Sequence, residues 1–431
     1  MVGFVELIRK NRNYRYTWLG QVVSEVGDHF NNIAVFSLAL QATGSGLVVT
    51  GVMLARAIPA VAAGPIAGVA LDRMNRKRIM IVSDLSRAVI ALCFLLCLGS
   101  QETWLLYILS ALLMFASPFF TSGRASILPT IASKEELHTA NSLTQATQWT
   151  TTAVGAFLGG ACVMHLGYRA AFIFNALSFV FSAACISRLK AVRGSFQVER
   201  TDLSEDRMVQ PWHEYVEGLR YMRSSPLILA IGLVGVGWAT GGGAAQILFS
   251  LFGEIVYKRG AAGIGEIWGC AGVGLVVGAA LAHWLGKRIG FDAYKRAIAI
   301  SYVIHGGAYV VFSLIPSYAG SLVFIALSRA AVAVSSVLNF SQLLRHVADE
   351  YRGRVFSTIE TLTWSTMMVS MMGAGIASQE YTPRQIGAVA GVLSSTTAIF
   401  WAWANWTGRL PEPERLGVEP DEVEVHGDPV M

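Results

Sequence analysis

The chain has 431 residues, of which 54% are hydrophobic and only 14% are charged. Soluble domains carry about 25% charged residues, so this composition excludes an ordinary water-exposed surface and indicates a polytopic membrane protein. The net charge of +5 does not indicate nucleic-acid binding, because the basic residues are spread over many short segments.

Apolar runs of about 20 residues, the length that crosses a bilayer as a helix, recur along the chain. The first run follows a basic segment and is too long for a cleavable signal, so we expect it to be retained. Twelve spans are predicted, at 16–40, 46–70, 79–99, 104–121, 143–166, 170–186, 227–252, 262–286, 297–315, 318–344, 355–377 and 386–406. The expected fold class is an all-α membrane protein with twelve transmembrane helices.

A long polar stretch divides the spans six and six. It ends in a segment, 212–222, whose apolar residues have helical spacing, which indicates an amphipathic helix on the membrane surface. We predict four parts, which are an N-terminal six-helix bundle (1–186), a cytoplasmic linker (187–225), a C-terminal six-helix bundle (226–408) and a disordered acidic tail (409–431).

Charge placement predicts the orientation. Lys and Arg crowd alternate connections, such as 73–78, 287–296 and 345–354, whereas 41–45 and 316–317 contain none. Basic residues that flank spans stay on the cytoplasmic side, so both termini should be cytoplasmic. We expect the protein in the plasma membrane.

The connection between the second and third spans reads G-V-A-L-D-R-M-N-R-K-R at 68–78. It resembles the signature loop between helices 2 and 3 of the major facilitator superfamily, with Asn75 where the family usually has a second glycine. Asn tolerates a left-handed backbone, so we expect the turn to survive. The resemblance implies a cytoplasmic gate here. Its expected residues are Gly68, Asp72, Arg73, Arg76 and Lys77, with Asp84 and Arg87 of the third span.

Other segments resemble the drug/proton antiporter subgroup that includes macrolide and enterobactin exporters. They are N-Y-R-Y-T-W-L-G-Q at 13–21, P-I-A-G at 65–68, S-D-L-S-R-A at 83–88 and R-G-R-V-F-S at 352–357, which matches that subgroup's loop before helix 11. A weak internal repeat aligns 278–288 with 68–78, as is typical of two pseudo-symmetric halves. The run G-A-F-L-G-G at 155–160 resembles an antiporter motif with Ala156 in place of proline, although small residues at this spacing also serve helix packing.

Three charged residues lie deep in the first two spans. Glu25 and Asp28 are three residues apart and share one helix face, and Arg56 lies at similar depth. Charges at the bilayer centre are costly and often functional, so we interpret Asp28, Glu25 and Arg56 as a proton-coupling site. A buried structural ion pair is the alternative.

Further polar, aromatic and Met residues are candidates for a substrate cavity. They are Asn31, Asn32, Gln145, Gln148, Trp149, His305, Arg329, Trp364 and Met368. Arg329 either faces the cavity and attracts an anionic group or pairs with Asp28 or Glu25. His305 is more typical of a hydrogen-bonded core residue than of a proton relay.

The resemblance implies a secondary transporter, with proton-coupled efflux of an amphipathic drug, macrolide or siderophore by alternating access. A lysophospholipid or nutrient transporter of the same fold is the alternative, and a non-transporting membrane receptor is an alternative of another class. We expect a monomer in the lipid bilayer that binds a small molecule and protons or another coupling ion. No cofactor, metal or enzyme activity is expected, because P-loop and H-E-x-x-H motifs are missing.

Overall fold

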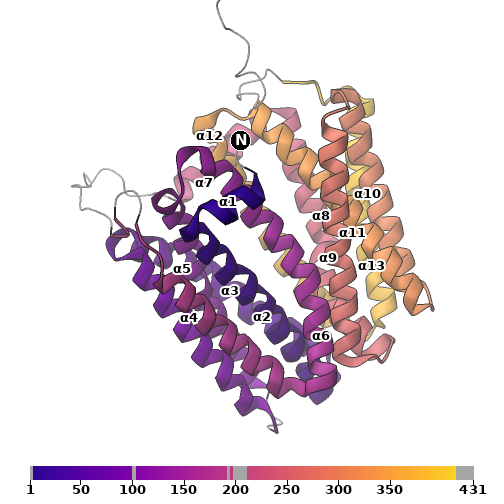
Figure 1. Cartoon of the computed structure of the whole chain (residues 1–431). Helices are drawn as coiled ribbons and strands as arrows, with labels where there is room; N and C mark the ends of the chain where they lie inside the picture. The colour runs from indigo at the N-terminus through magenta and orange to yellow at the C-terminus, as the bar shows by residue number, and fades with distance from the viewer. Residues whose placement is uncertain (1–2, 100–102, 192–194, 198–210, 414–431) are drawn as a thin grey trace, which may run out of the picture.

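The computed structural model describes residues 3–99, 103–191, 195–197 and 211–413, and the regular secondary structure within these ranges is helical (Figure 1). The N-terminal helices are α1 (Phe4–Lys10), α2 (Arg12–Thr43), α3 (Gly46–Arg73), α4 (Arg76–Cys93, extended by a 3₁₀ turn to Cys97), α5 (Trp104–Ile131) and α6 (Lys134–Ser187). They are followed by α7 (Pro211–Ser224), α8 (Pro226–Leu251, extended by a π-helical turn to Val256), α9 (Gly260–Gly286), α10 (Phe291–Leu314), α11 (Tyr318–His346), α12 (Asp349–Ala377) and α13 (Pro383–Trp406).

Nine of the described helices are long and apolar enough to cross a membrane. One of them, α6, contains two spanning arms, and α2 and α12 are of full length but carry more polar residues. The described residues therefore supply twelve spanning segments. Large apolar side chains such as Val369, Ile399 and Val323 are mostly exposed on the outside of the bundle, as expected of a surface that contacts lipid.

The two arms of α6 meet at Gly167, whose φ of 81° lies in the left-handed region that favours glycine. Contacts with α2 show that the arms are antiparallel. Tyr14 and Glu25 of α2 bind Ala140 and Thr151 in the first arm, so this arm runs in the same direction as α2. A Cβ on Gly27 would lie 2.9 Å from Asn175, and Gly20 faces Ser182, so the second arm runs in the opposite direction.

The helices form two bundles whose internal packing matches. In the first, α3 packs on α5 and α4 on the second arm of α6, and in the second, α9 packs on α11 and α10 on α13. The helix α7 precedes the second bundle and packs on α12, where Glu217 and Arg354 are 2.8 Å apart. The fold-class prediction of an all-α membrane protein with paired bundles is confirmed.

The bundles touch mainly at the end remote from α1 and α7, which we term the closed end (Figure 1). There α6 packs on α9, and the outer parts of α3 and α12 meet where Gly46 faces Ser378. The opposite end, which carries α1, α7 and the basic connections, is the open end. Two hydrogen bonds between described residues join the bundles, and both end on Glu254 at the closed end.

Several helices extend beyond the predicted spans. The helix α5 continues to Ile131 rather than ending at 121, and α12 begins at Asp349, so the R-G-R-V-F-S segment at 352–357 is helical and not a loop. Asn75 is extended, with φ −66° and ψ 110°, and not left-handed as expected. Its side chain accepts a hydrogen bond from the Arg78 backbone N–H and so caps α4, a role for which Asn is well suited. Residues 414–431 of the predicted tail lie outside the described ranges.

Candidate functional site

A cavity of about 280 Å³ lies at the junction of the two bundles. One wall is the first arm of α6, and the others come from α8, α9 and α11. Its aromatic and polar lining consists of Trp149, Thr152, Trp238, Gln246, Phe249, Trp268, Arg329 and Ser336. We term it the central cavity. Of the predicted cavity residues, Trp149 and Arg329 line it.

Arg329 of α11 is only 6% exposed, and its guanidinium lies over the Phe249 ring at 5.0 Å from the centroid. Among the described residues, no ion pair joins Arg329 to Asp28 or Glu25. A cation–π contact leaves most guanidinium donors unused, because the ring face accepts no more than one edge of the group. Arg329 is therefore a buried cation whose charge is not balanced by a described carboxylate.

Two tryptophans of the central cavity also hold unused donors. The indole N–H groups of Trp238 and Trp268 are buried without a hydrogen-bond acceptor in the described part of the chain. The Trp268 ring packs edge-on against Phe249 at 4.9 Å, which fixes its position beside Arg329. Buried donors are normally paired, and these two indole N–H groups find no acceptor although Thr152, Gln246 and Ser336 line the same cavity.

Glycines allow α6 and α9 to approach closely below the cavity. A Cβ on Gly265 of α9 would lie 2.5 Å from the Ala156 carbonyl oxygen, and one on Gly272 would lie 2.7 Å from the Cα of Ala153. Gly160 faces Ala261 in the same interface, whereas Gly155 and Gly159 pack on α2. The glycine motif at 155–160 thus serves helix packing, and its role in antiport stays a prediction.

Glu25 forms a network with α5 and α6. Its carboxylate lies 3.3 Å from the Arg124 guanidinium and accepts hydrogen bonds from Gln21 at 2.9 Å and Thr151 at 2.6 Å. Arg124, not Arg56, is therefore the counter-charge of Glu25. The sequence-based span ended at 121 and left Arg124 outside the membrane, so this partner was missed; the helix continues and carries Arg124 to Glu25.

No ion pair between described residues joins Asp28 to Arg56 or to Arg87, which is paired with Asp84 instead. One terminal nitrogen of Arg56 is buried without a partner in the described chain. The amide groups of Asn31 and Asn32, which follow on α2, are likewise unpaired at one or more buried atoms. This face of α2 is polar and incompletely satisfied.

The predicted gate residues fall into two separate groups. Asp84 and Arg87 form a buried ion pair within α4, and the Arg87 guanidinium lies over the rings of Phe120 and Phe179. Asp72 is 70% exposed and lies 4.0 Å from Arg76 at the open end. The expectation that Asp84 and Arg87 join the network of Asp72 is therefore not met in this conformation, because the two charges pair with each other inside the bundle.

The basic part of the loop is held by backbone carbonyls. Arg76 donates to the carbonyl oxygens of Leu71 and Ser126, and Lys77 donates to that of Leu189 at 2.8 Å. Arg73 is exposed, and a Cβ on Gly68 would meet open space. These contacts hold the loop against the first bundle, which leaves Asp72 and Arg73 facing away from it.

The other predicted cavity residues are not among those that line the central cavity. Trp364 and Met368, with Glu360, line a cavity of about 410 Å³ between α3 and α12. Gln145 and Gln148 are exposed on α6 and hydrogen-bond to each other at 3.3 Å. His305 is buried and bound to the Ser328 hydroxyl at 2.7 Å, as expected of a core histidine.

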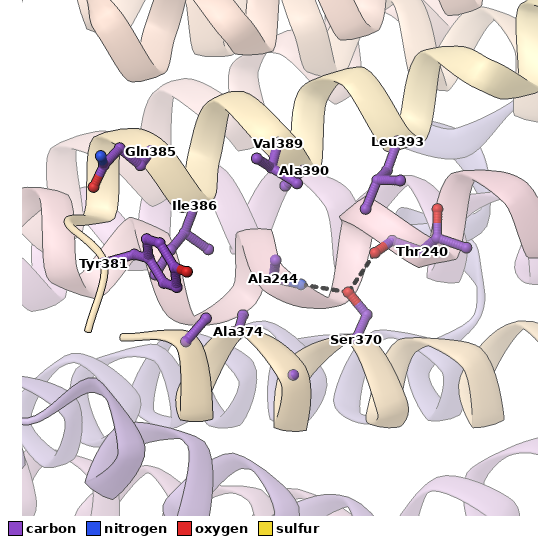
Figure 2. Close-up of a pocket in the computed structure, with 12 residues that line it drawn as sticks. Thr240, Ala244, Ser370, Ala374, Tyr381, Gln385, Ile386, Val389, Ala390 and Leu393 are labelled. Atoms are coloured by element: carbon purple, nitrogen blue, oxygen red, sulfur yellow. Dashed lines mark hydrogen bonds between the residues drawn. The ribbon is translucent and has the colours of Figure 1, made fainter. Parts of the chain in front are cut away.

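A third cavity, of about 360 Å³, lies within the second bundle between α8, α12 and α13 (Figure 2). Its walls are mostly apolar, and its central hydroxyl is already used. Ser370 accepts from the Ala244 N–H at 3.1 Å and donates to the Thr240 carbonyl oxygen at 2.6 Å. This cavity therefore offers no charge and few free polar groups to a ligand.

Comparisons with known proteins agree on one family. The family model described as Major Facilitator Superfamily matches residues 17–371. The chain is 26% identical to the uncharacterized MFS-type transporter YfiS of Bacillus subtilis (strain 168), over 86% of this chain and 88% of the relative. It is 24% identical to macrolide efflux protein A of Streptococcus pyogenes, over 82% and 85%. A solved variant of the nucleoside transporter NupG shares the fold, with a TM-score of 0.71 at 9% identity, over 92% of this chain and 99% of that one.

Proposed function

The chain belongs to the Major Facilitator Superfamily and is a secondary transporter, not an enzyme, and from this premise we propose that it exports an amphipathic small molecule in exchange for protons. In this fold two bundles rock about a binding site between them, so that the site opens alternately to each side. The proposed substrates are drugs, macrolides or siderophores.

The observation that carries the proposal is the central cavity itself. It lies between bundles that touch at the closed end and separate toward the open end. Its lining combines aromatic surface with a buried cation, as expected of a site for a molecule that is partly apolar and partly polar. A static receptor has no evident need for an interface that closes at only one end, so this geometry favours transport.

The basic connections support an assignment of the open end to the cytoplasm. The segments 73–78, 287–291 and 345–349 all join helices at the end that carries α7. By the positive-inside rule this end, with both termini, faces the cytoplasm of a cell whose plasma membrane holds the protein. The structure then corresponds to the inward-facing state, in which a substrate for export would load.

The deep acids of α2 support proton coupling. We assign Asp28 as the proton carrier, because its carboxylate lies midway along α2 and no ion pair with a described residue holds it. Arg56, which likewise forms no ion pair with a described residue, is the proposed counter-charge. Glu25 assists, because its ion pair with Arg124 and its hydrogen bond from Thr151 tie α2 to α5 and α6.

The resemblance to macrolide efflux protein A supports export over uptake. A lysophospholipid or nutrient transporter of the same fold remains the alternative, and it would use the same cavity. The test is reconstitution of the purified protein in liposomes with a pH-sensitive dye inside. Macrolides, siderophores, lysophospholipids and nutrients are offered in turn under an imposed proton gradient.

We expect accumulation of an amphipathic drug or siderophore, accompanied by proton movement in the opposite direction and abolished by a protonophore. Accumulation that is indifferent to the protonophore would refute proton coupling. Transport of lysophospholipid alone would favour the alternative substrate class. Binding without transport of any compound would favour a receptor.

A further inference from the structure

Three residues that line the central cavity carry hydrogen-bond donors for which the described chain supplies no partner. The Arg329 side chain is largely buried, and no hydrogen bond or ion pair from another described residue reaches its guanidinium. The indole N–H groups of Trp238 and Trp268 are buried without an acceptor in the described chain. Three walls supply them, since Trp238 lies on α8, Trp268 on α9 and Arg329 on α11. A buried donor that lacks an acceptor is strongly unfavourable, so this arrangement favours a ligand that brings acceptor atoms and negative charge.

We propose that the central cavity selects organic anions, in which an acid group bound by Arg329 is carried on an aromatic body that packs against the tryptophans. The inference deepens the proposed function and rests on it, because it names the substrate class of the same cavity. Trp149 of α6 belongs to the opposite bundle, so a ligand held between it and Arg329 would contact both halves.

Comparison with other cations shows why Arg329 is the anchor, since Arg56, which also forms no ion pair with a described residue, does not line the central cavity. Arg124 is paired with Glu25, Arg87 with Asp84, and Arg259 with Glu266 at 3.6 Å. Each therefore has its charge balanced by a described carboxylate. Arg329 has the ring of Phe249 instead, which carries no formal charge. The carboxylate of a bound organic acid could therefore form the ion pair that no described residue forms with this guanidinium.

The size of the cavity limits the aromatic body. Drug-sized ligands occupy pockets of about 300–1,000 Å³, and the central cavity, at about 280 Å³, is at the lower limit. It therefore fits a one- or two-ring acid, or the acid-bearing end of a larger molecule that extends toward the open end. The body would replace water against Trp149, Trp238 and Trp268, which adds apolar contact to the charge pairing.

The test compares three probes that share one ring system and differ in charge. Purified full-length protein in detergent is titrated with radiolabelled 1-naphthylacetate, and 1-naphthylacetamide and 1-naphthylmethylammonium are used as competitors. A charge-assisted hydrogen bond in a buried site corresponds to roughly tenfold in affinity or more. We expect the acid to bind at least about tenfold more tightly than the amide, and the ammonium to compete least.

The variants assign this preference to one residue. Arg329→Gln should abolish the difference between acid and amide, and Arg329→Lys, which keeps the charge, should retain part of it. Arg259→Gln is the matched control, since that guanidinium also lies over a ring, Tyr318, but outside the cavity. It should leave the preference unchanged. If Arg329→Gln does not fold, the comparison of wild type with Arg329→Lys still decides.

Equal affinity for acid and amide in the wild type, absence of binding by all three probes, or a preference that survives Arg329→Gln would overturn the inference. Its failure is distinguishable from failure of the proposed function. Proton-coupled export of a cationic or neutral drug would refute the anion site and leave the exporter intact. Selective acid binding without proton-coupled transport would refute the proposed exporter and leave the anion site intact.

Discussion

The carboxylate of Glu25 and the guanidinium of Arg124 lie 3.3 Å apart and join α2 to α5. Both side chains are mostly buried, with 21% and 15% exposure, so solvent weakens their attraction only in part. Thr151 donates to the second carboxylate oxygen and ties the pair to α6. Three helices of the first bundle therefore meet at one acid.

The first prediction concerns the stability of this junction. Arg124→Gln should destabilise the protein by about 1–3 kcal/mol, because it leaves a partly buried carboxylate without its counter-charge. Thermal denaturation in detergent should show a lower melting temperature. Glu25→Gln in the same chain should recover part of the loss, since no charge is then left unpaired. The exposed Arg73→Gln is the matched control and should melt like the wild type. Additive effects of the two substitutions would contradict a direct interaction.

The second prediction separates a proton carrier from a structural acid at position 28. Asp28→Asn should lower stability by less than about 1 kcal/mol, because no ion pair is broken, whereas loss of a partner from a buried pair costs about 3–5 kcal/mol. The variant should bind substrate and catalyse exchange without a gradient, yet lose accumulation driven by protons. Substrate-dependent proton flux that persists in well-folded Asp28→Asn would remove Asp28 from the coupling step.

The third prediction concerns the predicted gate at Asp72. This side chain is exposed at the open end, so Asp72→Asn should leave folding intact. If it contacts the second bundle when the open end closes, transport should fall by about tenfold or more, as expected for loss of one charge-assisted contact. Asp292→Asn, at the corresponding connection of the second bundle, is the control and should transport normally. Wild-type flux in Asp72→Asn would exclude a gating role.

The fourth prediction concerns the contact that fastens the closed end. Glu254 accepts hydrogen bonds from Ser37 at 2.9 Å and Gln41 at 3.2 Å across the two bundles. Glu254→Ala should favour the alternate state, so spin labels at positions 43 and 380 should show a larger population of long distances by pulsed electron resonance. Glu266→Ala changes an acid near the same end within one bundle, and it should leave the distance distribution unchanged. A distribution unaffected by Glu254→Ala would show that helix packing alone holds this end.

The fifth prediction tests the orientation. In a cysteine-free background, a cysteine at Thr43 should react with an impermeant thiol reagent on intact cells, and one at Ser224 should react only after lysis. Both positions are exposed, so access to the reagent depends on the side of the membrane. The opposite labelling pattern would reverse the assigned orientation in the membrane, and the described state would then be outward-facing.

Apolar runs predicted the helical fold because a bilayer imposes one rule on every span, which is to be apolar and about 20 residues long. The same signal misplaced the helix ends. Hydropathy falls where polar residues begin, but the helical backbone hydrogen bonding can continue past that point. In α5 the helix continues through Arg124 to Ile131. The sequence identified Asn75 as a turn residue. It did not show whether Asn75 has a left-handed backbone or caps a helix, because this depends on the path of the chain into α4.

Depth was predictable for single residues, but partners were not. Glu25, Asp28 and Arg329 were identified from their positions within spans. Their neighbours come from helices far away in sequence, as the separation of 99 residues between Glu25 and Arg124 illustrates. Trp238 and Trp268 look like ordinary apolar residues of α8 and α9 in the sequence. Only the packing of α8, α9 and α11 reveals that both residues line a cavity with Arg329.

The glycine contact between α6 and α9 has a mechanical consequence. Where Gly265 meets Ala156, backbone lies on backbone, so no interlocked side chains need to change rotamer when one helix rolls on the other. This backbone contact therefore defines a pivot about which the two bundles can rotate with little steric resistance. A bulky residue at Gly265 would push α6 and α9 apart at this pivot. Because displacement grows with distance from a pivot, the helix ends at both membrane surfaces would move further than the contact itself.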